Sequence, residues 1–151
     1  MAIRRLKELS ESDKACVIEA IKALLQSHEE VLFALLYGSM VDPIVQEKYG
    51  DIDVAVYIKA DRLKAAEYVL EAHLEAEAYR LLSASRLVFP PVEITILNNA
   101  PYPFLLSLFR NRYIVLKENE DVMTDFIEDV SGRALANSHL RKESLREVLE
   151  D

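Results

Sequence analysis

The stretch that decides the fold of this chain reads VLFALLYGSMVDPIVQEKYGDIDVAVYI over residues 31–58. Its first part, Val31–Tyr37, is a continuous apolar run of seven residues that is too short for an independent helix and ends at a glycine, which favours a buried strand. After the loop, Asp51–Ile58 alternates in polarity, which predicts a second strand. The alternation places Asp51 and Asp53 on the same face of that strand.

The loop between these two strands begins and ends with glycine. Two of the three glycines of the chain, Gly38 and Gly50, stand at its ends, and eleven residues separate Ser39 from Asp51. Because glycine reaches backbone conformations that other residues avoid, its placement indicates that backbone geometry matters in this loop.

An amphipathic helix is expected before the first strand, over Ser12–Glu30, with Ser10 or Ser12 as its N-cap. Its apolar stripe is Ala15, Ile18, Ile21, Leu24 and Leu25. The single cysteine, Cys16, falls in this stretch and is expected in the core. One cysteine excludes an internal disulfide and cannot by itself form a zinc site.

The remaining elements follow from periodicity and from helix-breaking residues. Ala60–Ser83 has no glycine or proline and predicts one long helix, whose apolar stripe runs through Leu63, Ala66, Leu70, Leu74 and Leu81. The later elements are a strand over Val92–Leu97, a short helix over Phe104–Phe109, an edge strand over Tyr113–Leu116 and a helix over Glu118–Val130.

This order of elements predicts one α/β domain, residues 1–151, with a small mixed sheet flanked by helices. Connections of different lengths favour a mixed sheet over a wholly parallel one. The segment from Arg133 onward is charged and weakly periodic. We therefore expect residues 131–151 to form a C-terminal arm that docks a partner, in a homo-oligomer or a hetero-oligomer.

Composition excludes several classes of protein. The net charge of -8 opposes general nucleic-acid binding, which draws its free energy from lysine and arginine. The longest apolar run, seven residues, is far below the roughly 20 that a membrane helix needs. The first ten residues lack the apolar segment of a secretory signal. A cytoplasmic protein without a membrane span is expected.

Paired carboxylates carry the expected chemistry. Asp51 and Asp53, two residues apart on one strand face, would repel unless a divalent cation lay between them, and oxygen ligands favour Mg²⁺, with Mn²⁺ as the alternative. Glu93 adds a third carboxylate if its strand lies beside theirs with the same face up. Three such groups suit a site with two metal ions, which clamps the attacking and leaving oxygens of a phosphoryl displacement.

The Gly38-Ser39 turn is expected to hold a phosphate. Glycine lets the backbone approach a phosphate closely, and exposed N–H groups together with a hydroxyl can bind its oxygens. A short helix that begins over Met40–Ile44 would add its N-terminal dipole. Tyr37 is near this loop but is expected to pack, and Arg112 is expected to be a solvated surface residue.

In combination, Gly38-Ser39, eleven residues and Asp51-x-Asp53 in an alternating strand resemble the signature of nucleotidyltransferases of the DNA polymerase beta superfamily. In size the chain resembles the minimal, MNT-type members, and the likeness runs from about Leu24 to about Glu120. The resemblance implies that Gly38 and Ser39 bind the triphosphate of ATP. It also implies that Asp51, Asp53 and Glu93 are the catalytic residues and the ligands of two Mg²⁺ ions.

Many proteins of this type are antitoxins encoded beside an HEPN-type ribonuclease, and some transfer AMP from ATP to a tyrosine of that toxin. The resemblance therefore implies a protein adenylyltransferase that acts as an antitoxin. The family usually has aspartate at the third acidic position, and the longer Glu93 is expected to alter or weaken catalysis.

Two other functions remain open from the sequence. One is an antitoxin that neutralises its partner by complex formation with weak or no catalysis. The other is nucleotidyl transfer to a small molecule, which is disfavoured because the chain has little beyond the core to build an acceptor pocket.

Overall fold

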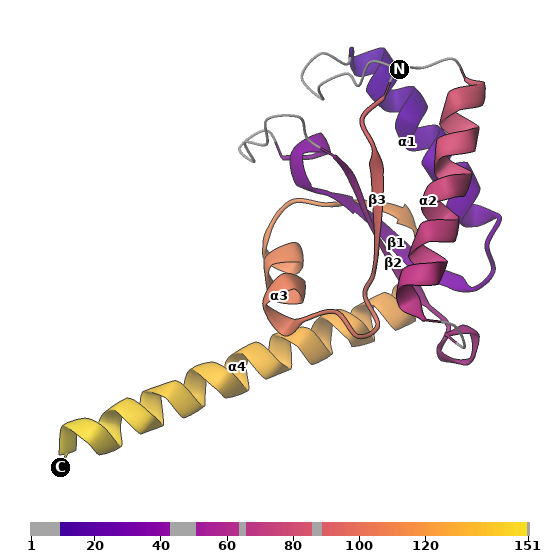
Figure 1. The fold of residues 1–151 in the computed structure, drawn as a ribbon. Coiled ribbons are helices and arrows are strands. Elements are labelled where there is room, and N and C mark those ends of the chain that lie inside the picture. The colour runs from indigo at the N-terminus through magenta and orange to yellow at the C-terminus, as the bar shows by residue number, and fades with distance from the viewer. Residues whose placement is uncertain (1–9, 43–50, 64–65, 86–88, 151) are drawn as a thin grey trace.

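A four-stranded mixed sheet lies between two pairs of helices (Figure 1). The structure is a computed structural model that describes residues 10–42, 51–63, 66–85 and 89–150, with side chains as far as residue 136. The strands are β1 (Val31–Tyr37), β2 (Ile52–Ile58), β3 (Val92–Ile96) and β4 (Ile114–Lys117). Their order is β3-β2-β1-β4, with β2 and β3 parallel and the other pairs antiparallel. The predicted mixed sheet and the predicted edge strand are confirmed.

Four α-helices and two short 3-10 turns complete the described chain. The helices are α1 (Glu11–Gln26), α2 (Glu67–Ala84), α3 (Tyr102–Arg110) and α4 (Glu120–Glu150), and the turns are η2 (Gly38–Met40) and η3 (Ala60–Arg62). No helix within these residues has the length and apolar character that a membrane crossing requires. The helix expected over Met40–Ile44 lies partly outside the described residues, and so does Gly50.

The two faces of the sheet bury two separate apolar clusters. One cluster packs one face against α1 and α2, and the other packs the opposite face against α3 and α4 (Figure 1). In β2 the predicted alternation holds, because Val54 and Val56 belong to the first cluster whereas Ala55 belongs to the second. In β1 a bulge between Val31 and Phe33 shifts the register, so these two residues contribute to different clusters.

Helix α1 starts where it was predicted, but its buried stripe differs. The Ser10 hydroxyl accepts a hydrogen bond from the Asp13 backbone N–H at 3.0 Å and caps the helix. The buried residues are Val17, Ile21 and Leu25, which recur every four residues. Cys16 is exposed, so its predicted place in the core is wrong. Successive residues of a helix are rotated by about 100° around its axis, so Cys16, which precedes the buried Val17, is turned away from the sheet.

The long helix predicted over Ala60–Ser83 is wrong at its start. The turn η3 comes first, and α2 begins only at Glu67. The helix buries Leu74, Ala78 and Leu82, whereas Leu81 is 38% exposed. The sequence stripe favoured the larger leucine, but packing on the sheet selects the small Ala78, which allows close approach.

The last helix is much longer than predicted. Its expected range was Glu118–Val130, whereas α4 continues without a break to Glu150 and covers 31 residues. Its first half packs on the sheet through Phe126 and Val130. Its second half projects away from the remainder of the molecule (Figure 1). The charged C-terminal segment is therefore helical.

Two interactions fasten the turn between α1 and β1. Lys117 in β4 donates from Nζ to the carbonyl oxygens of Leu25, at 3.3 Å, and His28, at 2.8 Å. The imidazole of His28 lies between two carboxylates, with Nδ1 2.6 Å from Glu30 and Nε2 2.7 Å from Glu77. Partial burial lowers the pKa of His28, but the hydrogen bonds to Glu77 and Glu30 outweigh it, so the pKa is raised.

Candidate metal and nucleotide site

Three carboxylates meet at one end of the sheet. One ligand oxygen from each of Asp51, Asp53 and Glu93 lies within 4.8 Å of the other two. Asp51 is half-buried just before β2, Asp53 is buried with only 9% exposed, and Glu93 is exposed. Burying a carboxylate beside two others is unfavourable unless positive charge compensates, so this group is suited to a divalent cation.

The register of the sheet explains how Glu93 reaches this group. Strands β2 and β3 are parallel, and Asp53 is the direct partner of Glu93. Partners in neighbouring strands point to the same face, so both carboxylates rise on the side of α3. The longer glutamate side chain still brings its oxygen into the group, and the prediction that its strand lies beside β2 with the same face up is confirmed.

Gly38 follows β1 in a conformation that glycine favours. Its φ is +76°, in the left-handed region. A Cβ at this position would collide with Oδ2 of Asp53 and would lie 3.3 Å from its Cγ. Any side chain here would therefore displace the buried carboxylate. Gly38 is required by its backbone conformation and by the close approach of Asp53.

Ser39 is the second residue of the turn, and its hydroxyl is buried. Its Oγ has no hydrogen-bond partner within the described structure. A buried hydroxyl without a partner is unfavourable and is accounted for if a ligand oxygen completes it. Ser39 lines a hollow with residues of α1 and with Ile114, on a different side of the turn from the pocket that contains Gly38.

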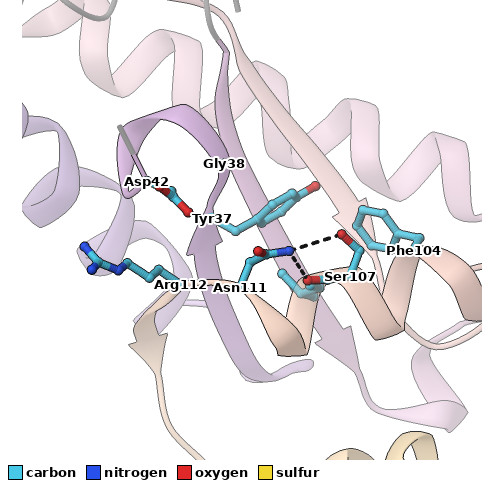
Figure 2. A pocket seen from close by; sticks show the side chains of 8 residues that line it. Tyr37, Gly38, Asp42, Phe104, Ser107, Asn111 and Arg112 are labelled. Carbon is cyan, nitrogen blue, oxygen red and sulfur yellow. Dashed lines mark hydrogen bonds between the residues drawn. The ribbon is translucent and has the colours of Figure 1, made fainter. Parts of the chain in front are cut away.

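A pocket opens from Gly38 towards α3, with a cavity volume of about 170 Å³. Figure 2 shows the side chains that line it. They are Tyr37, Asp42, Phe104, Ser107, Leu108, Asn111 and Arg112. The rings of Tyr37 and Phe104 meet edge to face, with centroids 5.8 Å apart. The expected packing role of Tyr37 is thus confirmed, but the residue also borders the site.

The negative field of the site extends to α2. Burial and the negative charges of Glu75, Glu67 and Glu93 raise the pKa of Glu71. Glu67, Glu71 and Glu75 form a row of carboxylates on α2. In this row Glu75 accepts from the Ile94 N–H at 2.9 Å, and Glu67 accepts from the Asn99 amide at 2.7 Å. Carboxylates therefore crowd the β3 side of the sheet, where a cation would be favoured.

Sequence reasoning missed most of the pocket lining on α3. Phe104, Ser107 and Asn111 lie in or just after that helix, and they are far in sequence from the Gly38 turn. Arg112 is exposed, as expected for a solvated surface residue, and it also lines the pocket. The apolar periodicity of α3 located the helix, but nothing in that signal indicates which of its polar residues faces the turn.

Comparison with protein families gives one match over most of the chain. The model for polymerase beta nucleotidyltransferases matches residues 19–121, which include the Gly38-Ser39 turn and all three carboxylates. No curated protein is matched by the chain.

Solved structures share the fold at low sequence identity. A chain of a toxin-antitoxin complex with AMP-PNP is 18% identical with a TM-score of 0.59, and the match covers 87% of this chain and 98% of that chain. A chain from the complex of tri-AMPylated Shewanella oneidensis HEPN toxin with MNT antitoxin is 17% identical with a TM-score of 0.57, covering 90% and 98%. A chain of a mutant MntA toxin-antitoxin complex is 16% identical with a TM-score of 0.60, and the match covers 87% of this chain and 98% of that chain.

Proposed function

The chain belongs to the polymerase beta nucleotidyltransferase family, and on that premise we propose that it transfers AMP from ATP to a tyrosine of a partner HEPN-type toxin and so acts as an antitoxin. The observation that carries the proposal is the convergence of Asp51, Asp53 and Glu93 beside the Gly38 turn. Its support from relatives is the AMPylated toxin in a complex that contains a chain of the same fold.

The donor set fits two Mg²⁺ ions, with Mn²⁺ as the alternative. All three ligands are carboxylate oxygens, which hard cations prefer, and their separation of at most 4.8 Å allows them to share ions. Bound there, divalent cations would neutralise the charge on the phosphoryl oxygens and orient them. The buried position of Asp53 agrees with a site completed by a cation.

The residues of the chain have distinct tasks in the proposed reaction. Gly38 and Ser39 hold the triphosphate through backbone N–H groups and a hydroxyl. Asp51 and Asp53 would hold the divalent cations, whose charge would orient the α-phosphate. The tyrosine oxygen forms a bond to the α-phosphorus as the bond to the oxygen bridging to the β-phosphate breaks. Pyrophosphate leaves, and in this proposal Glu93 takes the phenolic proton, which its exposure to solvent supports.

The test is to incubate the chain with a purified HEPN-type toxin, ATP and Mg²⁺, and to measure AMP on the toxin by mass spectrometry. The double variant Asp51→Ala, Asp53→Ala should label at least about a thousandfold more slowly, because the metal site supplies several kcal/mol of transition-state stabilisation. The control is Asp121→Ala, Asp125→Ala, which removes two exposed carboxylates from α4. Equal labelling by wild type and the Asp51, Asp53 variant would reject this site.

A second candidate is neutralisation by complex formation alone. The observation in its favour is the projecting half of α4, which contains residues 131–150 of the proposed docking arm (Figure 1). Truncation after Val130 separates the two functions. If binding alone neutralises, the truncated chain fails to protect cells from the toxin, whereas the Asp51, Asp53 variant protects fully. If transfer is needed, the Asp51, Asp53 variant binds the toxin but does not protect.

A further inference from the structure

The pocket beside Gly38 lies next to the carboxylates on the same face of the sheet. Tyr37, which lines it, is the direct cross-strand partner of Asp53, so both side chains point towards α3. A nucleotide whose phosphates lie at the Gly38 turn and the carboxylates can therefore extend its base into this pocket.

Asn111 offers a hydrogen-bond acceptor whose direction is fixed. Its Nδ2 donates to the backbone carbonyl oxygen of Ser107 at 2.7 Å. A carbonyl oxygen can only accept, so the group facing it must be the amide nitrogen, and the amide cannot be reversed without losing this bond. Figure 2 shows Nδ2 directed at Ser107 and the amide oxygen turned away from it. The amide oxygen, Oδ1, is left as the acceptor.

Ser107 offers the complementary donor. Its Oγ lies 3.3 Å from Nδ2 of Asn111 and accepts from it. A hydroxyl that accepts in this way retains its own hydrogen for donation. Both residues line the pocket, and both are exposed. Ser107 and Asn111 therefore present one donor and one acceptor at the wall of the pocket.

We propose that Ser107 and Asn111 read the Watson–Crick edge of the nucleotide base and select a base with an exocyclic amino group beside an unprotonated ring nitrogen. Asn111 Oδ1 accepts from the amino group, and Ser107 Oγ donates to the ring nitrogen. Adenine and cytosine fit this pair. Guanine and uracil present a carbonyl beside an N–H and place like groups against each other.

This inference rests on the proposed function, because it assigns the base subsite of the same nucleotide. The aromatic rings of Tyr37 and Phe104 support it, since they give the pocket a surface against which a base can pack. Stacking tolerates every base, so discrimination falls to hydrogen bonds. Two residues that no motif contains would thus set the base preference.

The test compares ATP with inosine triphosphate, which replaces the amino group by a carbonyl and protonates the ring nitrogen. Dissociation constants are measured by titration calorimetry in Mg²⁺ without partner. Wild type should bind ATP at least about tenfold more tightly than inosine triphosphate. The inosine base would lose a hydrogen bond and would place acceptor against acceptor and donor against donor. Asn111→Ala and Ser107→Ala should each reduce this ratio towards one while affinity for inorganic tripolyphosphate stays unchanged.

The control is Asn99→Ala, because Asn99 is also an exposed asparagine that donates through its amide nitrogen, to Glu67, but does not line the pocket. It should keep the wild-type ratio. Thermal unfolding verifies that each variant is folded. Equal binding of the two nucleotides by wild type, or an unchanged ratio in both pocket variants, overturns the inference.

Failure of the proposed function gives a different result. Nucleotide binding that survives Asp51→Ala, Asp53→Ala without change would show that the carboxylates are not the metal site, whereas the ratio of the two nucleotides would still report on Ser107 and Asn111. A wild-type chain that binds neither nucleotide overturns both.

Discussion

The two ends of the β1 and β2 pair treat carboxylates in opposite ways. At the end where Val31 pairs with Ile58, the carboxylates of Glu30 and Glu77 enclose the imidazole of His28. At the end where Tyr37 pairs with Asp53, carboxylate meets carboxylate. In the first arrangement the carboxylates raise the pKa of the imidazole and hydrogen-bond to it, which supports the fold. The second brings like charges together, which is unfavourable without a compensating cation and agrees with the proposed metal site.

Gly38→Ala should have the largest effect on this comparison. The left-handed φ and the collision with Asp53 are expected to lower the free energy of unfolding by about 2–3 kcal/mol. Nucleotide-dependent labelling should be lost as well, because the buried carboxylate must move. Urea unfolding at pH 7 measures the first effect, and mass spectrometry of the partner measures the second.

Gly132→Ala is the matched control for that change. A Cβ on Gly132 meets nothing within 4 Å, and the residue is inside α4. Alanine should therefore raise the free energy of unfolding by about 1 kcal/mol. If both glycine variants changed the free energy of unfolding in the same direction, the inference that the Gly38 turn requires glycine would be wrong.

His28→Gln tests the other end. The pKa of His28 is raised in the folded state, so its contribution to stability is complete below the unfolded pKa and is lost as pH rises through the folded value. The variant should be less stable than wild type by about 1 kcal/mol at pH 6, allowing for partial exposure of the carboxylates. The difference should shrink by pH 9. Urea unfolding across this pH range measures it.

His73→Gln serves as the comparison for this pH dependence. His73 lies on the exposed side of α2, the helix that also carries Glu77. Its removal should leave the pH dependence of wild type intact. A pH-independent loss in His28→Gln would contradict a charged imidazole between the two glutamates.

Glu71→Gln should give the smallest change in the free energy of unfolding, and it should raise stability where His28→Gln lowers it. Its raised pKa means that ionisation of Glu71 costs the folded state free energy, so this cost is absent at low pH and appears as pH rises through the raised value. Relieving two like-charge pairs at helical spacing should raise stability by about 0.5 kcal/mol at pH 7. The gain should vanish as pH falls below 4.5.

Glu75→Gln separates crowding from hydrogen bonding in the same row. Glu75 accepts from the backbone of Ile94, so its neutralisation weakens a charge-assisted bond to the edge of the sheet. It should lower stability where Glu71→Gln raises it. Thermal unfolding of both variants at pH 7 shows whether each glutamate of the row destabilises the fold by charge repulsion or stabilises it by hydrogen bonding.

Much of the sheet and of the acidic group could be predicted because both depend on local patterns. The alternation of β2 places Asp51 and Asp53 on one face without reference to the remainder of the chain. The apolar run ending at Gly38 gave the limits of β1 as observed. Such patterns are sufficient where one strand face is buried and the other carries chemistry.

The errors concern properties that packing decides. Cys16 and Leu81 are apolar residues on amphipathic helices, and each is turned from the core by a rotation that sequence spacing does not resolve. Asn111 could not be identified, because its role depends on how α3 lies across from the Gly38 turn. These are consequences of tertiary packing, which overrides local preference.

The two hydrogen bonds from Lys117 to the carbonyl oxygens of Leu25 and His28 can form only late in the synthesis of the chain. The bond to Leu25 joins residues 92 positions apart, and α1 has no basic residue of its own in its last turn. Both carbonyls also accept from nearby backbone, since the His28 N–H donates to Leu25 at 3.2 Å and the Val31 N–H donates to His28 at 3.1 Å. During translation the N-terminal helix therefore gains only the Lys117 ammonium when β4 emerges, 92 residues after Leu25. At ordinary elongation rates of about 5–20 residues per second this interval is roughly 5–18 s. The end of α1 therefore has local hydrogen bonds from the start and acquires its cation only after most of the chain has been synthesised.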